Sequence, residues 1–334
     1  MPMQESPAAV AQSTNNDPVS AVSIATTARL HFGFFDPSGK SSKPFGSFGL
    51  SLSEPWTRLT LRHASKNAVH GTEAERAARY LDTIRKAHGI EQAYSLDIES
   101  AIPSHAGLGS GTQLALAVGT AFGILEGLDL SPSKIAALLE RGTRSGIGIA
   151  SFALGGAILD SGPREATLPQ LVARAPFPEP WRTLLIFDPE AKGLDGADEL
   201  AAFETLPAYS EDERAELEAR IVERALPALE TGNFGAFCDE VGHLQARMGA
   251  YFAPLQGGVF TSRRVAGVVA ALRAAGARGL GQSSWGPTGF AFAETEADGL
   301  RLLDVASKAD RTGTLRFVLT RGRNSGAEIT CHSA

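Results

Sequence analysis

Two short turns rich in glycine and serine contain the residues of this chain best suited to hold a phosphate group. The first, Ile102–Gln113, reads Ile-Pro-Ser-His-Ala-Gly-Leu-Gly-Ser-Gly-Thr-Gln, and an apolar stretch follows it. The second, Gly279–Gly289, reads Gly-Leu-Gly-Gln-Ser-Ser-Trp-Gly-Pro-Thr-Gly. Glycine leaves backbone N–H groups unhindered by Cβ atoms, and the neighbouring hydroxyls add further donors. Both turns are therefore candidate anion-binding sites.

The first turn leads into a segment, Gln113–Leu125, that is apolar on nearly every side and predicts a helix buried between layers. The unpaired N–H groups and positive end of such a helix favour an anion at the turn. The turn does not end in the Lys-Ser or Lys-Thr pair of a Walker A loop, and it lacks Gly-x-Gly-x-x-Gly spacing. A tight connection that needs glycine only for steric reasons remains the alternative.

The elements that must position these turns follow from apolar periodicity and capping residues. The predicted strands are 28–32, 59–62, 94–98, 183–187, 289–293 and 315–320. The predicted helices are 72–87, 113–125, 131–141, 210–232, 261–275 and 296–309. Together they predict an α+β fold.

Residues 1–22 have little to bury and are expected to form a disordered tail. A proline-dense stretch, 162–180, predicts a boundary between an N-terminal subdomain at 23–165 and a C-terminal subdomain at 175–334.

Charge and composition exclude several classes of function. The net charge of −6 gives no general attraction for nucleic acid or an anionic membrane. The two cysteines, Cys238 and Cys331, are too far apart in sequence to indicate a zinc site or a disulfide framework. The first basic residue is Arg29, and no apolar run reaches about 18 residues, so a cytoplasmic location is expected.

The first turn resembles the phosphate loop of the GHMP kinase superfamily through its Pro-x-x-x-Gly-Leu-Gly-Ser-Gly pattern. Four segments in collinear order resemble one family of that superfamily, the β-ribofuranosylaminobenzene 5′-phosphate synthases. They are Arg29–Asp36, Pro103–Gln113, Arg144–Gly148 with Gly155-Gly156, and Gly281–Pro287. The resemblance implies a GHMP fold, with an N-terminal half like ribosomal protein S5 domain 2 and a ferredoxin-like C-terminal half.

The resemblance also implies an activity, decarboxylating phosphoribosyl transfer. Phosphoribosyl pyrophosphate and 4-hydroxybenzoate or 4-aminobenzoate would form a C-riboside, with release of CO2 and pyrophosphate, in the synthesis of tetrahydromethanopterin for one-carbon metabolism. A homodimer is the expected assembly.

Departure of pyrophosphate requires donors that are fixed beforehand. The resemblance implies that the backbone and hydroxyls of the first turn supply them, and that Mg2+ accompanies the pyrophosphate. Asp36 is the candidate carboxylate for a cationic transition state. Arg29, His31 or Arg144 would orient the benzoate carboxylate, and Phe32 or Trp285 would stack on its ring.

Other candidate residues carry open alternatives. His105 is a candidate general acid or base, or else a helix cap. Gln282, Ser283 and Ser284 are expected to bind substrate rather than act as nucleophiles, with a hydrogen-bonded turn as the alternative. Gln256 and Gly257 are predicted to open a helix that meets the 5′-phosphate. Lys40 lies in a segment that usually contains arginine in the family, and is a candidate phosphate contact.

The complete set of predicted site residues has two parts. The catalytic candidates are Asp36, His31 and His105. The substrate-binding candidates are Arg29, Lys40, Gly107, Leu108, Gly109, Ser110, Gly111, Thr112, Gln113, Arg144, Ser145, Gln256, Gly257, Gln282, Ser283, Ser284 and Trp285.

Three other functions remain open. An ATP-dependent GHMP kinase for a small alcohol shares the fold and the phosphate loop. A classical phosphoribosyltransferase is disfavoured, because Leu185–Asp188 runs into Pro189-Glu190 without the paired acids and Thr-Gly turn of that class. A noncatalytic regulator that binds a phosphorylated metabolite is the third.

Overall fold

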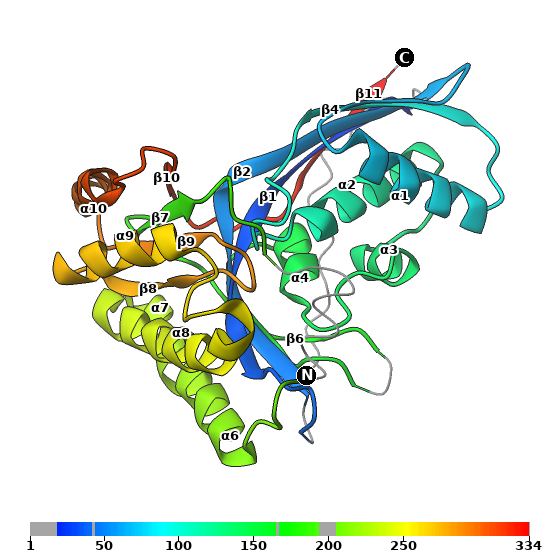
Figure 1. Ribbon diagram of the computed structural model, residues 1–334. Coiled ribbons are helices and arrows are strands. Elements are labelled where there is room, and N and C mark those ends of the chain that lie inside the picture. Colours follow the sequence, from blue (N-terminus) through cyan, green and yellow to red (C-terminus); the bar gives the residue numbers. More distant parts are fainter. Residues whose placement is uncertain (1–18, 42–43, 165–166, 194–204, 334) are drawn as a thin grey trace.

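The computed structural model describes residues 19–41, 44–164, 167–193 and 205–333 of the chain. Within these residues it contains two sheets, each covered by helices (Figure 1). The first sheet follows the order β11-β1-β2-β4-β3, and β5 pairs with β2 while β6 pairs with β5. Its strands are β1 (Val19–Asp36), β2 (Phe45–Ala64), β3 (Ala68–Gly71), β4 (Ala93–Ser100), β5 (Ala157–Asp160), β6 (Leu171–Ala175) and β11 (Glu328–Ser333).

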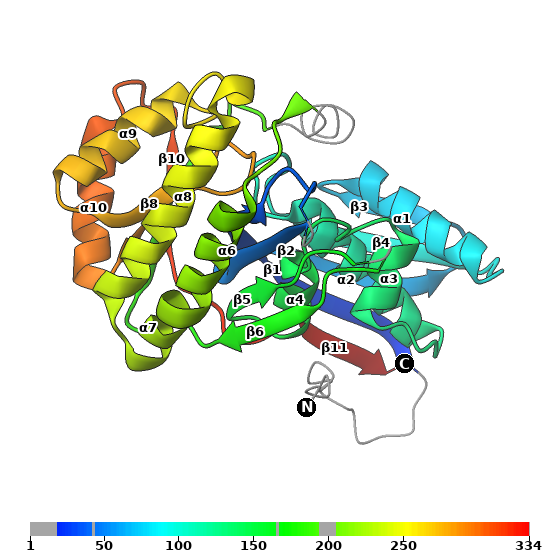
Figure 2. The same ribbon diagram turned by 90° about the horizontal axis from the view of Figure 1, so that it is seen from below.

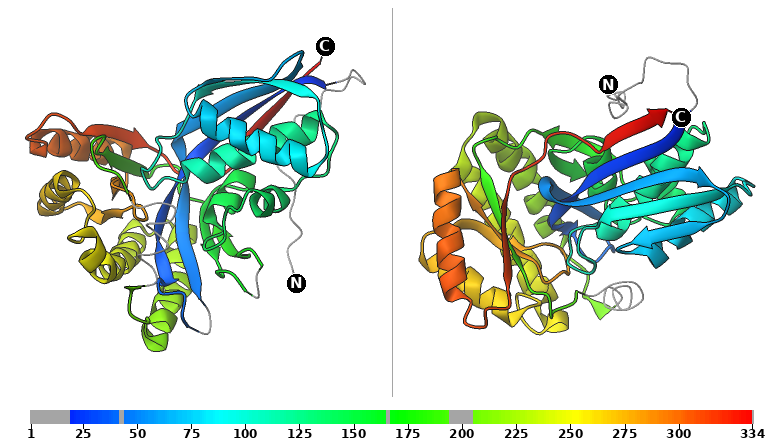
Figure 3. Two further views of the ribbon diagram at one scale, coloured as in Figure 1. Left: turned by 45° about the vertical axis from the view of Figure 1, so that its right-hand side comes forward. Right: turned by 90° about the horizontal axis from the view of Figure 1, so that it is seen from above.

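Four helices belong to the first sheet and lie together beside it (Figure 3, left). They are α1 (Ala74–Ala87), α2 (Ser110–Leu125), α3 (Pro132–Leu138) and α4 (Ile147–Ala153). Helix α2 is buried nearly all round, as its apolar sequence predicts, because α1 and α3 pack on it and strands lie beneath it. The Ser131 hydroxyl accepts from the Lys134 N–H and caps α3, at the residue where the predicted helix 131–141 begins.

The second sheet has the order β10-β7-β9-β8, and neighbouring strands are antiparallel. Numbered within this half, that is the order 4-1-3-2 with helices between strands, which confirms the predicted ferredoxin-like arrangement. The strands are β7 (Arg182–Phe187), β8 (Arg278–Gln282), β9 (Gly289–Ala293) and β10 (Arg316–Thr320). The helices are α6 (Glu211–Arg220), the π-helical segment η1 (Ile221–Ala225), α7 (Leu226–Thr231), α8 (Phe234–Gln256), α9 (Arg263–Ala274) and α10 (Glu296–Ala309).

The long strand β1 passes through both halves of the molecule (Figures 1 and 2). Its first part, with Val22 and Ile24, lies in the core beneath α1 and α2. Its second part, with Leu30 and Phe32, lies in a different core that includes Phe237 of α8. The chain therefore uses one strand to fix the two halves relative to each other.

Three boundaries differ from those predicted. Strand β11 pairs antiparallel with β1, so residues 328–333 join the first sheet, not the C-terminal half (Figure 3, right). Strand β6 pairs with β5 and extends the same sheet to Ala175. Residues 1–18 of the predicted tail lie outside the described residues, whereas Val19–Val22 are part of β1. In the part of the chain that the structure describes, no helix is long and apolar enough to cross a membrane.

Candidate functional site

The two glycine-rich turns lie directly against each other, although 176 residues separate Gly107 from Ser283. The Ser283 hydroxyl donates to the Gly107 carbonyl at 2.8 Å. A Cβ atom on Gly107 would lie 2.1 Å from the Ser283 carbonyl oxygen, and one on Gly286 would lie 2.3 Å from Cα of Gly107. Glycine is thus required at both positions because the two backbones touch.

Strand β1 connects the two turns. The Arg29 guanidinium donates to the Gly107 carbonyl at 2.5 Å. The His31 N–H donates to the Ser283 hydroxyl, and the Ser284 N–H donates to the His31 carbonyl, both at 3.0 Å. The β1–β2 register shifts on both sides of this segment, between Thr27 and Arg29 and again after His31. Such irregularities redirect side chains, and they occur often next to functional sites.

Positive charge gathers where α2 begins. Gly109 adopts a left-handed conformation there, no side chain caps the helix, and its first turn has no acidic residue. The Nη1 atoms of Arg141 and Arg76 lie 3.8 and 3.9 Å from the point where a Cβ of Gly111 would be. Arg29 lies 3.3 Å from the corresponding point on Gly109. Three guanidinium groups and a helix N-terminus are suited to a polyanion.

A buried carboxylate holds the turn before α4. One oxygen of Asp160 accepts from the Ser47 and Ser145 hydroxyls, at 2.6 and 3.1 Å, and from the Gly146 N–H at 2.9 Å. Its other oxygen accepts from the Gly162 N–H at 2.8 Å. Burial raises the pKa of this carboxyl, although the hydrogen bonds oppose the shift. The cluster fixes the backbone at Ser145 and hence the start of α4.

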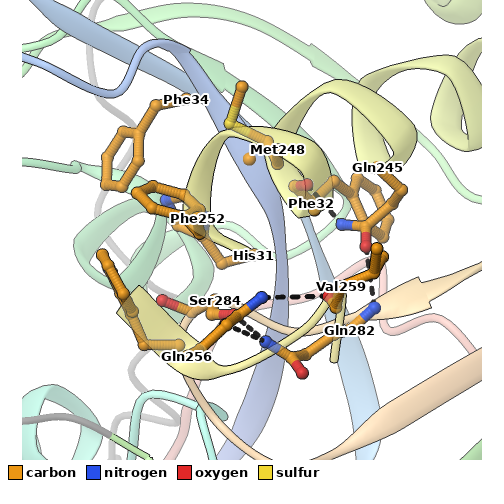
Figure 4. A pocket seen from close by; sticks show the side chains of 13 residues that line it. His31, Phe32, Phe34, Gln245, Met248, Phe252, Gln256, Val259, Gln282 and Ser284 are labelled. Carbon is orange, nitrogen blue, oxygen red and sulfur yellow. Dashed lines mark hydrogen bonds between the residues drawn. The ribbon is translucent and has the colours of Figure 1, made fainter. Parts of the chain in front are cut away.

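A pocket lies between β1, α8 and the second turn (Figure 4). Much of its wall is aromatic or aliphatic, and Phe252 packs on Trp285 with ring centroids 4.2 Å apart. The lining residues are His31, Phe32, Gly33, Phe34, Gln245, Met248, Gly249, Phe252, Gln256, Val259, Gln282, Ser284 and Trp285.

Three glutamines in this pocket hold its walls together. The Gln245 amide donates to the Phe32 carbonyl and accepts from the Gln282 N–H. The Gln282 amide donates to Gln256 at 3.3 Å (Figure 4). It also accepts from the Thr261 N–H at 2.7 Å. These amide groups therefore connect α8, β8 and β1 to one another.

His31 differs from the glutamines, because neither ring nitrogen has a hydrogen-bond partner among the described residues. Its side chain is 2% exposed and lies beside Phe34, with ring centroids 4.5 Å apart. Burial, and then the nearby charges of Arg29 and Arg144, hold the pKa of this histidine well below its usual range. His31 is consequently neutral near pH 7.

Comparison with known proteins identifies the group to which the chain belongs. The family model for the N-terminal domain of GHMP kinases matches residues 74–156, and the model for the C-terminal domain matches 225–310. The chain belongs to the GHMP kinase superfamily. The GHMP fold is also that of a homoserine kinase from Cytophaga hutchinsonii, which is 16% identical with a TM-score of 0.66 over 95% of this chain and 98% of that one. A mevalonate diphosphate decarboxylase from Staphylococcus aureus is also 16% identical, with a TM-score of 0.64 over 93% of this chain and 98% of that one.

Within the GHMP superfamily, the relatives are β-ribofuranosylphenol 5′-phosphate synthases. The protein of this name from Archaeoglobus fulgidus is 29% identical over 92% of this chain and 98% of its own length. The protein of the same name from Methanothermobacter thermautotrophicus is 28% identical over 91% of this chain and 97% of its own length. These relatives confirm the family expected from the sequence and make the chain an enzyme of the pentosyltransferase type.

Of the predicted residues, most lie in one region of this GHMP protein, and several of them are engaged in holding it together. Ser283 and Gln113 are fully buried. Gln113 accepts from the Thr26 hydroxyl at 2.5 Å and donates to the Gly148 carbonyl at 2.8 Å, so it links β1, α2 and α4. In contrast, Ser110 and Thr112 are only partly buried in the first turn of α2, where a ligand of the phosphate loop would contact them.

Asp36 lies at the end of β1 and is fully buried. One carboxylate oxygen accepts from the Ser38 and Gly39 N–H groups and from the Ser38 hydroxyl, and the other accepts from the Ser41 N–H. This geometry favours a structural role for Asp36 over the predicted catalytic one. Lys40 donates to the carbonyl of Leu206 at 2.8 Å and so contacts the protein backbone.

Two other predicted positions also have backbone roles in the structure. His105 has a φ of 57°, and its carbonyl accepts from the Gly193 N–H at 3.2 Å. Gln256 and Gly257 do not open a helix, contrary to the prediction. They end α8, where Gly257 is the left-handed residue after the last turn, and α9 begins later with Ser262 as its cap.

Several site residues escaped prediction from the sequence. Arg76 lies on the predicted helix 72–87, but only its folded position shows that it points to the phosphate loop. Asp160 is a single carboxylate at a strand end without a motif around it. Met248 and Phe252 belong to α8, whose helical pattern is interrupted by glycines and by Pro254. The described residues contain no group of three or more His, Cys, Asp or Glu side chains that could hold a metal ion.

Proposed function

We propose that this chain is a decarboxylating phosphoribosyltransferase. It transfers the ribosyl phosphate of phosphoribosyl pyrophosphate to the ring of 4-hydroxybenzoate or 4-aminobenzoate in tetrahydromethanopterin synthesis. The observation that supports this most directly is full-length similarity to β-ribofuranosylphenol 5′-phosphate synthases, combined with contact between the two turns that carry the family's pattern.

The site has the charge distribution that this reaction requires. The positive end of α2 and the guanidinium groups of Arg29, Arg76 and Arg141 surround the first turn of α2 and bind the pyrophosphate. As the C1–O bond breaks, the leaving pyrophosphate takes the electron pair, and these fixed donors stabilise its growing negative charge. Catalysis requires donors that are already in place, and hydrogen bonds to the Gly107 and Leu108 carbonyls of the first turn keep Arg29 in position.

On the acceptor, the ring carbon that carries the carboxylate forms a bond to C1 of the sugar. The bond to the carboxylate then breaks, its electron pair returns to the ring, and CO2 leaves. A neutral His31 provides no cation for this carboxylate, and Arg29 is assigned to the pyrophosphate. Arg144 is therefore the group we assign to the carboxylate, and His31 is withdrawn from that role.

We propose that Mg2+ enters as the complex with phosphoribosyl pyrophosphate, as part of the substrate. The described residues do not supply a carboxylate cluster of their own for it, and no step here is assigned to the metal. A cytoplasmic location and a homodimer belong to the same proposal, the homodimer because the family resemblance implies it. Size-exclusion chromatography with light scattering tests the dimer.

The deciding experiment is turnover by the full chain with phosphoribosyl pyrophosphate, Mg2+ and each benzoate labelled in its carboxyl carbon. Equal amounts of CO2 and pyrophosphate are expected, with the benzoate consumed. CO2 release no faster than in the enzyme-free control would overturn the proposal. Consumption of ATP with a small alcohol in a parallel assay would instead show the kinase activity that shares this fold.

A further inference from the structure

Among the described residues, a buried side chain of the pocket beside the second turn has two ring nitrogens without a hydrogen-bond partner. That residue is His31, which lies 2% exposed among Phe34, Phe252 and Met248. A buried polar group without a partner is destabilising, so a ligand that supplies the missing hydrogen bond binds more tightly than one that does not. The pocket thus favours a ligand that places one polar group at His31.

The rest of the pocket favours a flat aromatic ring. Phe34 lies 4.5 Å from His31, and Phe252 lies 4.2 Å from Trp285, measured between ring centroids. The three glutamine amides are bonded to one another and to the backbone, so their pairing leaves a mainly apolar wall toward the ligand. Aromatic rings prefer such surroundings, and ring–ring contacts strengthen their binding beyond the burial of apolar area.

We infer that this pocket is the subsite for the aromatic acceptor, in which a ring nitrogen of His31 accepts a hydrogen bond from the ring hydroxyl. Helix α8 supplies Met248 and Phe252 as specificity-determining residues. The inference rests on the proposed function and adds the location of the acceptor ring. The relatives are synthases of a ribofuranosylphenol by name, so a phenol ring is the chemistry to be recognised. A neutral imidazole accepts from the uncharged hydroxyl of a phenol, whereas a carboxylate here would lack a charged partner in His31.

The test compares two probes that differ by one hydroxyl group, 4-hydroxybenzoate and benzoate. Calorimetry on the full chain, with and without inorganic pyrophosphate, measures their dissociation constants. The unaltered chain is expected to bind 4-hydroxybenzoate about tenfold more tightly than benzoate, as one hydrogen bond implies. Equal affinities, or no binding of 4-hydroxybenzoate in either condition, would overturn the inference.

The His31→Phe variant removes the hydrogen bond and keeps an aromatic ring. It is expected to weaken 4-hydroxybenzoate about tenfold and to leave benzoate within about twofold, whereas His31→Asn, which retains a donor and an acceptor, restores part of the preference. His70→Phe is the matched control on an exposed histidine of β3. An equal loss for both probes would show that His31 contacts the carboxylate or only shapes the pocket, and would contradict the inference.

A second variant keeps the inference testable if His31 variants do not fold. Phe252→Leu is expected to weaken both probes by about three- to tenfold, because it removes the aromatic face. Phe234→Leu is its matched control, at the other end of α8, where Phe234 packs on Trp181. If the Phe252→Leu variant bound both probes as tightly as the unaltered chain, the acceptor ring would not lie in this pocket and the inference would be overturned. Because binding is measured without turnover, an inactive chain that still prefers 4-hydroxybenzoate would contradict only the proposed function.

Discussion

His31 shows at the scale of one residue how the fold decides chemistry that a sequence pattern leaves open. Alternation around it predicts a half-exposed strand, with Arg29 and His31 on one face and Leu30 and Phe32 on the other. In the structure, α8 covers one part of β1 while α2 and α4 contact it as well, so Leu30, His31 and Phe32 are all buried. Period-two alternation cannot reveal a second covering layer when polar residues are retained for function.

The lowered pKa of His31 has a predictable effect on stability. The unfolded chain binds a proton near pH 6.5, whereas the folded chain does not until a much lower pH, so protonation favours unfolding. The free energy of unfolding should therefore be constant above about pH 7 and fall as the pH drops below 6.5, by up to about 1.4 kcal/mol per pH unit for this group. Urea denaturation between pH 5 and 8 measures the slope.

His243 contributes in the same direction, since burial lowers its pKa too. The contribution of His31 is consequently obtained as a difference. His31→Asn should have a shallower slope of unfolding free energy against pH than the unaltered chain below pH 6.5. Identical slopes for the unaltered chain and His31→Asn would show that His31 takes up a proton equally well in both states.

The contact between the two turns predicts an unusually sensitive glycine. Gly286→Ala would place a methyl group 2.3 Å from the backbone of Ala106 and Gly107, and neither backbone is free to yield. We expect a loss of at least about 3 kcal/mol in the free energy of unfolding. Gly267→Ala is the control, because α9 leaves open space there, and it should stabilise by about 0.5–1 kcal/mol. Similar values for the two variants in urea denaturation would refute the contact.

Arg76 and Arg79 form a matched pair on α1. Arg76 lies near Gly111 at the start of α2, whereas Arg79 is exposed to solvent. Arg76→Met should raise the KM for phosphoribosyl pyrophosphate at least tenfold, because a charge-assisted contact to the diphosphate is lost, and Arg79→Met should leave it unchanged. Steady-state kinetics at fixed 4-hydroxybenzoate checks this. A KM unaltered by Arg76→Met would remove Arg76 from the site.

At the scale of the element, the residues that begin helices could be predicted from the sequence, whereas a helix stabilised by tertiary packing could not. The hydroxyls of Ser131 and Ser210 each accept from the N–H three residues ahead, as their local sequence predicts. Helix α8 was missed, because Gly235, Gly242 and Pro254 interrupt a helical pattern that tertiary packing against β8 and β1 nevertheless stabilises. Local signals determine helix ends, whereas packing decides whether an interrupted segment is helical.

The turn that begins α4 is held in place by the side chain of Asp160, which lies 14 positions beyond Gly146 in the sequence. Asp160→Ala leaves the Gly146 and Gly162 N–H groups without their acceptor in a buried site. We expect this variant to lose about 3 kcal/mol of unfolding free energy. Asp129→Ala is the comparison, since its ion pair with Lys134 is exposed and screened by solvent, so a clearly smaller loss is expected. Equal losses in thermal or urea denaturation would mean that Asp160 does not fix this turn.

For the whole molecule, the family resemblance predicted the fold correctly. The local sequence pattern, in contrast, put the boundary between the two subdomains in the wrong place. The proline-dense stretch 162–180 looks like a linker, yet β6 within it belongs to the first sheet, and β11 returns to pair with β1. Pairing between residues 300 positions apart leaves no local signal in a single sequence. The chain thus passes between the two halves twice, after β6 and again before β11, rather than through one linker.

A fragment containing residues 19–175 tests this joining. It retains α1 to α4 but lacks β11, and it exposes Leu30 and Phe32, which pack on α8 in the whole chain. We expect the fragment to lack a cooperative thermal transition by circular dichroism, whereas the full chain unfolds in one transition. A fragment that melts cooperatively would show that the first subdomain folds independently.

The return of β11 also bears on how the protein is made. On the ribosome, the edge of β1 that pairs with β11 stays unpaired until residues 328–333 have been synthesised. By then the glycine turn at Gly107 has long emerged. An exposed strand edge attracts other chains during that interval. Premature termination anywhere before Glu328 therefore leaves a nascent protein with an unpaired edge, a natural target for chaperones and proteases.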